Sequence, residues 1–169
     1  DYIRPKKFSK NNSTMFSGIN HALKWLYKKK NKKFESILLL QPTSPIRELS
    51  DLNLAIKIFN KKKIKSLVST TKMIEHPYEC VEYKKRNRWN FIVSNPNKVK
   101  EGRQLYKENF YYIDGSFYIA KTQFYLKNKS FFNKKYTKFF NQKRKWPVDI
   151  NDKEDLLIAE TFLKKKRKI

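Results

Sequence analysis

Asp149 and Asn151 are the residues of this chain whose types and spacing most directly suggest metal chemistry. They are two residues apart in a segment without a helical pattern, and in an extended segment such residues face the same way. Together they would offer oxygen ligands to Mg²⁺, which prefers carboxylates combined with phosphate oxygens. From these residues alone a simpler interpretation is preferred, in which Asp149 caps or pairs locally and Asn151 starts the next helix.

A second group of candidates lies in the loop Gln41-Pro42-Thr43-Ser44-Pro45. Its side chains are uncharged donors and acceptors and its two prolines stiffen it, which suits recognition of a base, a ribose or a sugar hydroxyl. Arg103 lies in a polar stretch and would suit bidentate binding of a carboxylate, although a surface arginine is the simpler explanation in so basic a chain. Phe131 and Phe132 are core or interface residues by default, with the wall of a sugar pocket as the alternative.

The first seventy residues predict the elements that would position these candidates. Ser13 can cap a helix that runs through Leu26, and Ser50 can cap a second one with Ala55 and Phe59 on its inner face. Each helix is followed by a short apolar strand, at 37–40 and 66–70, and the first of these suits a strand buried on both faces. This alternation predicts a wound α/β sheet, in which ligands bind beyond the carboxyl ends of the strands, where Gln41 stands.

The second half of the chain predicts fewer regular elements. Residues 75–107 are polar and irregular, with a hairpin around 82–93, and a strand at 112–120 is kinked or bulged at Gly115. Asn151 or Asp152 can cap a final helix, with Leu156, Ala159 and Leu163 on its inner face. No repeat or linker divides the chain, so 1–169 is interpreted as a single domain.

The composition adds a strong charge, with 40 Lys+Arg against 15 Asp+Glu and a net charge of +25. Phosphates attract such a chain, so a basic module that binds RNA or another polyanion without catalysis is one hypothesis. The preferred interpretation is a codon bias that loads the surface with lysine, because specific readers usually rely on arginine. Because Cys80 is the single cysteine, the chain cannot form an internal disulfide or a zinc site built from thiolates. No apolar stretch is long enough to span a bilayer.

Several short motifs occur together in an order that resembles the acylneuraminate cytidylyltransferases, also called CMP-sialic acid synthetases. The resemblance covers nearly the whole chain, and the Leu38–Pro45 and Val148–Ile150 pieces are its most specific parts. The motifs are Arg4-Pro5, Ser17-Gly18, His21-Ala22-Leu23, Leu38–Pro45, Val68-Ser69, Glu75-His76-Pro77, Gly102-Arg103-Gln104, Asp114–Ile119, Phe131-Phe132 and Val148–Asn151.

The resemblance implies a Rossmann-like α/β fold of the nucleotide-diphospho-sugar transferase kind, with a mixed, mostly parallel sheet that lacks the first βαβ portion. It implies a cytoplasmic homodimer with a dimerisation extension roughly within 75–145. The implied activity transfers CMP from CTP to a nonulosonic acid of the sialic or legionaminic type with Mg²⁺ and release of pyrophosphate, for cell-surface glycan synthesis. No specific nucleic acid and no membrane is implied as a partner.

The resemblance also implies roles for single residues. Asp149 and Arg103 are the implied catalytic residues, with Asp149 and Asn151 as metal ligands. Arg4, Thr14 and Gln41 would contact CTP. The implied sugar-binding residues are Gln41, Arg103, Gln104, Asp114, Tyr118, Phe131 and Phe132, of which the last two would reach across the dimer.

Three departures from the family pattern stand out. Asp114-Gly115 replaces an Asn-Gly pair, so the anionic Asp114 would need a Lys or Arg beside it or would bind a substrate amide or hydroxyl. Asn151 replaces an aspartate of the metal motif, which keeps a degenerate, inactive dimer partner as a further hypothesis. Nothing matches the family's glycine- and lysine-containing phosphate loop, so we expect an N-terminally truncated protein that does not turn over CTP by itself.

Overall fold

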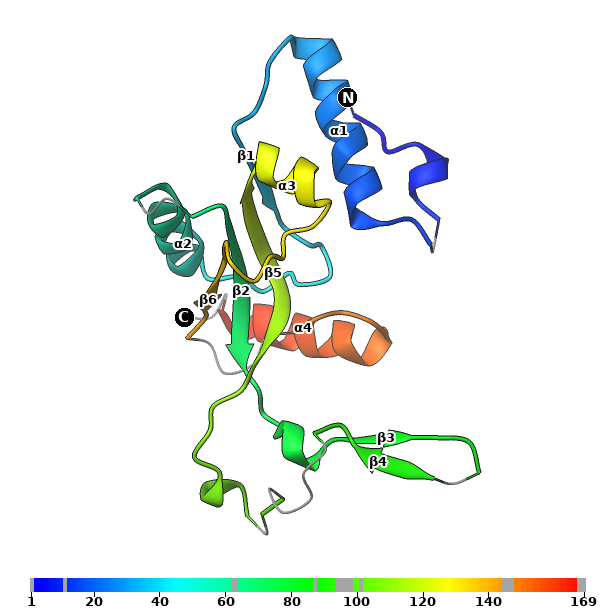
Figure 1. The fold of residues 1–169 in the computed structure, drawn as a ribbon, viewed down its shortest axis with the longest axis vertical. Helices are drawn as coiled ribbons and strands as arrows, with labels where there is room; N and C mark the ends of the chain where they lie inside the picture. The colour runs from blue at the N-terminus through cyan, green and yellow to red at the C-terminus, as the bar shows by residue number, and fades with distance from the viewer. Residues whose placement is uncertain are drawn as a thin grey trace.

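The computed structural model of this chain describes residues 2–10, 12–61, 64–86, 88–93, 99–100, 102–143 and 148–166. A four-stranded sheet forms the centre, with helices on both of its faces and an arm that projects from one end (Figure 1). The chain enters through a short 3-10 turn, η1 (Lys6–Phe8), beside the first helix. No helix in the described residues is long and apolar enough to cross a membrane.

The sheet has the strand order β1-β5-β2-β6, with β1 at Ser36–Leu39, β5 at Tyr111–Lys121, β2 at Ser66–Lys72 and β6 at Thr137–Asn141. The predicted mixed α/β sheet is confirmed. β5 runs antiparallel to β1 and to β2, whereas β6 runs parallel to β2. Three described strands therefore point the same way, but the expectation of mostly parallel pairing is wrong because β5 lies between β1 and β2.

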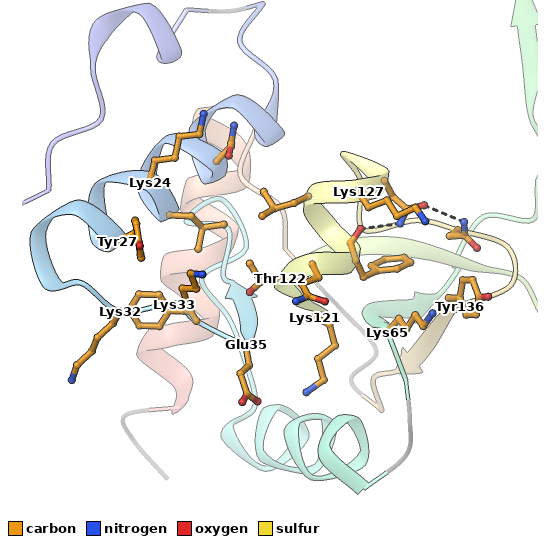
Figure 2. Close-up of a pocket in the computed structure, with 18 residues that line it drawn as sticks. Lys24, Tyr27, Lys32, Lys33, Glu35, Lys65, Lys121, Thr122, Lys127 and Tyr136 are labelled. Atoms are coloured by element: carbon orange, nitrogen blue, oxygen red, sulfur yellow. Dashed lines mark hydrogen bonds between the residues drawn. The ribbon is translucent and has the colours of Figure 1, made fainter.

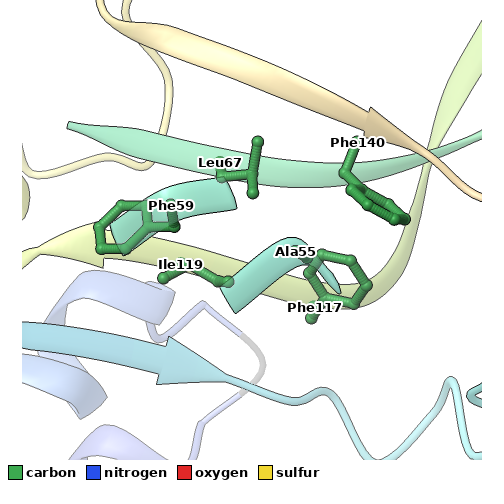
Figure 3. Close-up of a cluster of buried hydrophobic side chains, with 6 residues drawn as sticks. All are labelled: Ala55, Phe59, Leu67, Phe117, Ile119 and Phe140. Carbon is green, nitrogen blue, oxygen red and sulfur yellow. The ribbon is translucent and has the colours of Figure 1, made fainter. Parts of the chain in front are cut away.

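Helix α2 (Leu49–Lys61) covers one face of the sheet (Figure 3). Ala55 and Phe59, the predicted inner face, are buried against strand residues, as expected for an amphipathic helix. This first cluster consists of Ala55, Phe59, Leu67, Phe117, Ile119 and Phe140. Since side chains alternate along a strand, the residues between these on β2 and β5 face the other side of the sheet.

Helices α1 (Met15–Lys30) and α3 (Thr122–Asn128) lie on that other face. The second cluster consists of Val68, Tyr118, Ala120, Phe124, Tyr125 and Phe131, with Phe16, Ile19, Ile37 and Leu39 packed against it. Thr14 caps α1, because its hydroxyl accepts a hydrogen bond from the Ser17 amide at 3.1 Å. The prediction that Ser13 caps α1 is wrong, since its hydroxyl bonds the turn at Lys7 and Lys10 instead.

Strand β1 is buried on one face only. Ile37 and Leu39 pack against the second cluster, but Leu38 and Leu40 are 43% and 41% exposed. β1 ends the described sheet, and β5 is its one described neighbour. The expectation of burial on both faces is therefore wrong for this strand.

The arm spans the described residues between 73 and 110, and it carries the predicted hairpin, formed by β3 (Val81–Tyr83) and β4 (Trp89–Phe91). At its base, next to η2 (Pro77–Glu79), the ring of His76 stacks on Tyr106 with centroids 3.7 Å apart. The implied dimerisation extension, roughly within 75–145, stays a prediction, and within that range β5 and β6 belong to the central sheet.

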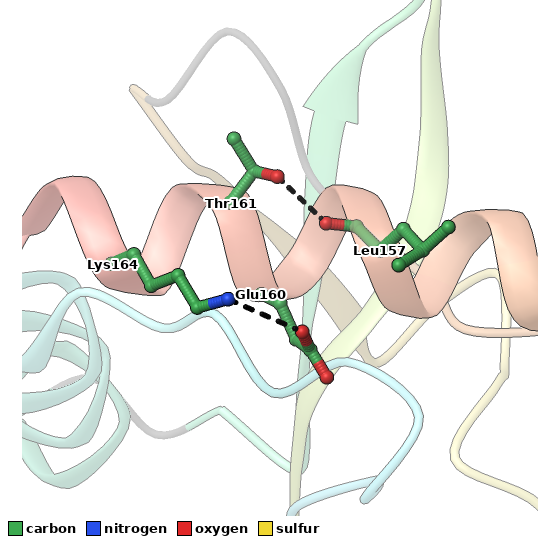
Figure 4. A network of polar contacts seen from close by, with 4 residues as sticks. All are labelled: Leu157, Glu160, Thr161 and Lys164. Carbon is green, nitrogen blue, oxygen red and sulfur yellow. Dashed lines mark hydrogen bonds and ion pairs between the residues drawn. The ribbon is translucent and has the colours of Figure 1, made fainter.

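Helix α4 (Lys153–Lys166) begins at Asp152, whose carboxylate accepts a hydrogen bond from the Asp155 amide at 2.9 Å. The predicted cap is confirmed. Ala159 is buried against Ile46 and Val148, but Leu156 and Leu163, which were predicted to face inward, are exposed. On the solvent side Lys164 pairs with Glu160 at 3.6 Å and Thr161 bonds the Leu157 carbonyl (Figure 4). Such surface pairs contribute little to stability.

Candidate substrate site at the carboxyl ends of the strands

A wide bulge in β5 shapes the site, as the sequence predicts from Gly115. Val68 pairs with Tyr118 and Thr70 with Ile113, so two steps along β2 correspond to five along β5. The extra residues leave the backbone ladder with β2, and Gly115 takes a φ of +71°, a conformation that favours glycine. The bulge therefore turns the backbone of residues 114–117 toward the loop that follows β1.

The carboxylate of Asp114 holds this bulge together from inside the protein. It accepts hydrogen bonds from the hydroxyls of Ser69 and Thr71, both at 2.6 Å, from the Ser116 amide at 3.0 Å and from the Gln142 side chain. Asp114 is buried, and a buried carboxylate is tolerated when donors surround it. All of these donors are uncharged. The negative charge of Asp114 is therefore stabilised by hydrogen bonds from these donors, and not by the Lys or Arg that the sequence analysis considered. Its implied contact with the sugar stays a prediction.

The loop 41–47 joins the bulge to the segment before α4. The buried hydroxyl of Ser44 lies 3.0 Å from the Asp114 carbonyl and 3.2 Å from Oδ1 of Asp149. A serine hydroxyl has one proton, so it donates to one of these two acceptors at a time. The Ile150 amide donates to the Thr43 carbonyl at 2.7 Å, which fixes the same two segments through the backbone.

Arg47 anchors the loop from its other end. Its Nε donates to the Ser116 carbonyl at 2.7 Å, and its Nη2 donates to the Gln41 carbonyl. One guanidinium thus connects the loop to the bulge. Sequence reasoning missed Arg47 and Ser44 as positioning residues. Their position in a proline-rich loop after a strand was a signal of a positioning role. Their partners on β5, the carbonyls of Asp114 and Ser116, could not be identified without the register of that strand.

Tyr118 and Gln41 meet on the same side of the loop. The Tyr118 hydroxyl lies 3.4 Å from Oε1 of Gln41 and donates to it. Burial, and after it the negative charges of Asp114 and Asp149, raise the pKa of Tyr118. Its hydroxyl therefore stays protonated through the neutral range and remains a hydrogen-bond donor.

The motif resemblance would gather Gln41, Arg103, Tyr118 and Asp149 around one pocket, and three of these, Gln41, Tyr118 and Asp149, are linked through Ser44 and the bulge. The fourth member of the predicted group, Arg103, belongs by its backbone to η4 (Arg103–Leu105) in the arm, and its side chain lies outside the described residues. Gln104, on the same turn, is exposed. The roles of Arg103 and Gln104 at the site stay predictions.

The two predicted aromatic residues have different environments. Phe131 is 2% exposed and packs against Tyr118 and Tyr125, so its ring has no open face for a sugar or a second subunit in this structure. The default interpretation as a core residue is the one that the structure supports. Phe132 is half exposed, and its ring lies edge-on to Tyr118 at 6.3 Å.

Two of the three predicted contacts for CTP, Arg4 and Thr14, lie near the start of α1. Arg4 is exposed, its Nε donates to the Ser9 hydroxyl at 3.1 Å, and its side chain passes over Gly18. Thr14 is engaged as the cap of α1. No hydrogen bond among the described residues joins either side chain to the loop 41–47, so both contacts stay predictions.

Asp149 and Asn151 do not form a preassembled cation cage. The Asn151 side-chain amide donates to the Asp149 carbonyl at 3.2 Å, and the Asn151 backbone amide donates to Asp155. Within the described residues no group of three or more His, Cys, Asp or Glu could hold a metal ion. A cation here would depend on oxygens from a substrate in addition to Asp149.

Comparison with known proteins supports the resemblance that the motifs indicated. The chain is 28% identical over 173 residues to the N-acylneuraminate cytidylyltransferase of Escherichia coli O18:K1:H7 strain RS218, covering 98% of this chain and 38% of that protein. It is 29% identical over 136 residues to the CMP-N,N'-diacetyllegionaminic acid synthase of Legionella pneumophila strain Philadelphia 1, covering 77% of this chain and 54% of the relative. No protein-family model matches the chain.

Proposed function

We propose that this chain forms the sugar- and metal-binding portion of a cytidylyltransferase that transfers CMP from CTP to a nonulosonic acid and releases pyrophosphate. Two relatives named for enzymes that make CMP-linked nonulosonic acids support the proposal. The chain spans 38% and 54% of their lengths, so the activity of a whole protein is part of the proposal. A nonulosonate of the sialic or legionaminic type is the substrate class that these names favour.

The single observation that carries the proposal is the convergence of Gln41, Tyr118 and Asp149 on one loop and one bulge. Tyr118 supplies a donor that stays protonated, and Gln41 supplies an amide with both donor and acceptor atoms. Such a pair suits the hydroxyls and the amide of an acylated sugar acid. In the proposed reaction the anomeric hydroxyl attacks the α-phosphate, and the protein contributes alignment and charge neutralisation.

Mg²⁺ is the proposed cofactor, with Asp149 and the carbonyl oxygen of Asn151 as its protein ligands. Carboxylate and amide oxygens fit a hard cation that keeps several waters and binds substrate phosphates. Ser44 is compatible with a cation at Asp149. Its hydroxyl can donate to the Asp114 carbonyl instead when a cation occupies Oδ1 of Asp149. When bound, the cation would neutralise charge on the transferring phosphate.

Ligand binding tests the proposed function without depending on turnover. In saturation-transfer NMR we expect signal transfer from the protein to N-acetylneuraminic acid and to CMP, and less to glucuronic acid and UMP. Gln41→Ala should weaken sugar-acid binding by about fivefold to tenfold, the size expected when one hydrogen bond to a ligand is lost. Gln123→Ala, a change at an exposed glutamine on α3, is the matched control and should leave binding unchanged.

Two outcomes of this experiment would contradict the proposed function. Equal transfer to all four compounds would show that the site does not recognise a nonulosonate or a cytosine base. Equal affinities of the Gln41→Ala and Gln123→Ala proteins would show that the loop 41–47 does not contact the sugar acid.

We also propose that the arm mediates the implied homodimer. Tyr83 and Trp89 form a cross-strand pair on the hairpin and are 80% and 51% exposed, which is unusual for large aromatic side chains. Exposed aromatic residues of this kind are often energetic centres of interfaces.

Sedimentation equilibrium tests this second proposal. The unchanged chain should sediment as a dimer, and Trp89→Glu should weaken dimerisation by about 30-fold or more, because a central Trp contributes about 2 kcal/mol or more. Glu82→Gln, on the neighbouring strand β3 and on the opposite face of the hairpin from Tyr83 and Trp89, serves as the control. A chain that is monomeric at all concentrations, or a Trp89→Glu protein that dimerises as well as the control, would contradict the proposal.

A further inference from the structure

A cavity lies at the end of the sheet opposite the candidate substrate site (Figure 2). Lys65 directly precedes β2, and Lys121 ends β5, whereas Thr71 and Asp114 occupy the other ends of these strands. The cavity has a volume of about 1130 Å³, and α1, the loop after it and α3 form its walls. None of the residues assigned to the proposed reaction lines it.

Positive charge dominates the lining of this cavity. Glu35 is the one acidic residue among the lining residues, which include six lysines, and the ammonium group of one of these, Lys121, lies 5.3 Å from the ring centre of Phe59 on α2. No salt bridge within the described part of the chain joins any of the six to a carboxylate, since the pairs found there are Lys84–Glu82 and Lys164–Glu160. The six lysines are Lys24, Lys32, Lys33, Lys65, Lys121 and Lys127.

Aromatic rings lie between these lysines. Tyr27 and Phe34 are 48% and 39% exposed within the cavity wall, and Tyr136 stands across from them. The ammonium groups of Lys33 and Lys65 lie 5.8 Å and 4.0 Å from the ring centres of Tyr27 and Tyr136, respectively. Lysine ammonium groups beside accessible rings are the combination by which proteins bind single-stranded nucleic acids, with phosphates on the cations and bases on the rings.

The size and the chemistry of the cavity together favour a chain-like ligand. Pockets for single small ligands usually measure about 300–1,000 Å³. A volume of about 1130 Å³ exceeds that range and suits several linked units. Lysines bind phosphates as point charges and lack the planar fork with which arginine reads base edges.

We propose that this lysine-lined cavity binds a short single-stranded segment of RNA or DNA without sequence preference. The proposal is independent of the proposed transfer reaction, because it involves other residues at the other end of the sheet. The net charge of +25 alone attracts any nucleic acid, so a test has to separate the cavity from the rest of the surface.

Charge-matched variants make this separation. The cavity variant carries Lys24→Gln, Lys32→Gln and Lys127→Gln, and the control carries Lys57→Gln, Lys138→Gln and Lys153→Gln. All six positions are exposed, and both variants lose three positive charges, so the overall attraction falls equally. Fluorescence anisotropy with a labelled oligouridylate of about 12 nucleotides, a length within the range that one binding fold covers, measures the affinity.

We expect the cavity variant to bind the oligouridylate at least about tenfold more weakly than the control variant. The slope of log K against log salt should fall in magnitude by about 2 for the cavity variant, as expected for three lost phosphate contacts to a single strand. Circular dichroism of both variants checks that they fold alike. Equal affinities and equal slopes of the two variants would overturn the proposal.

The aromatic residues distinguish a nucleic acid from a bare phosphate chain. The double change Tyr27→Ala and Phe34→Ala should weaken oligouridylate binding by about 30-fold or more, because two rings are lost and stacking of each base contributes about 1–3 kcal/mol. The same variant should bind inorganic polyphosphate as well as the unchanged protein does. If it loses affinity for neither ligand, or for both equally, the assignment to a nucleic acid is wrong.

Discussion

Asp114→Ala is expected to lower the free energy of unfolding by about 3–5 kcal/mol, because the donors around this carboxylate would lose their acceptor. Ser69, Thr71 and Gln142 are buried and would face a cavity instead of a carboxylate. The Ser116 amide would lose its bond within the bulge as well. Urea-induced unfolding, followed by circular dichroism, measures the difference in stability.

Asp114→Asn is the matched control for this prediction. An asparagine keeps one acceptor oxygen for Ser69 and the Ser116 amide and places its NH₂ group where Thr71 and Gln142 now donate. The Thr71 hydroxyl can turn to accept, and the Gln142 amide can flip to present its carbonyl. We therefore expect a loss below about 1.5 kcal/mol. An alanine variant as stable as the asparagine variant would show that the network contributes nothing.

Gly115→Ala is expected to lower the free energy of unfolding by about 3 kcal/mol and to dismantle the loop contacts. A left-handed conformation costs a residue with a Cβ about 1–2 kcal/mol, and overpacking adds about 1–3 kcal/mol. The added Cβ would lie 2.6 Å from Oε1 of Gln41 and 2.7 Å from Oγ of Ser44. Gln41 can swing aside, which breaks its bond to Tyr118, but buried Ser44 has to give up its contacts with Asp114 and Asp149.

Urea unfolding and saturation-transfer NMR measure both parts of this prediction, and Gly102→Ala provides the control. A Cβ on Gly102 would also lie 2.7 Å from its nearest atom, but that atom is the end of the exposed Gln104 side chain. Gln104 can move away at little cost, so this variant should keep nearly full stability, and because Gln104 is itself an implied sugar contact, stability is the quantity that this control compares. Similar losses in the two variants would mean that the bulge at Gly115 does not determine the geometry of the site.

The sequence predicted the bulge because glycine inside a strand often marks one, and it predicted the inner face of α2 at Ala55 and Phe59 from helical spacing. The Asp114 network was beyond sequence reasoning. Its donors come from β2, from the bulge itself and from the residue after β6, and only the register of three strands brings them together. The same limit applied to Arg47 and Ser44, whose partners are backbone carbonyls of β5 and of the loop, together with the Asp149 carboxylate.

The failures have a different origin. The apolar runs at 37–40 and in α4 predicted buried side chains. An apolar side chain is buried only where another element of the fold packs against it, and the sequence pattern does not specify that element. Leu38, Leu156 and Leu163 are exposed in the described structure, whereas Ala159 is buried and Ile37 is partly buried against the second cluster. Sequence reasoning identified which side chains are apolar and could not identify which of them would find a neighbour.

Strand β1 has a consequence for the behaviour of this chain in solution. Beyond β5 no described strand pairs with it, so its outer backbone edge and the exposed Leu38 can join the same edge of another copy. Mutual repulsion between molecules that each carry a charge of +25 opposes such encounters. This colloidal protection depends on ionic strength, because the screening length shrinks from about 30 Å at 0.01 M salt to about 3 Å at 1 M. Low salt concentration therefore disfavours association of two copies through the edges of their β1 strands.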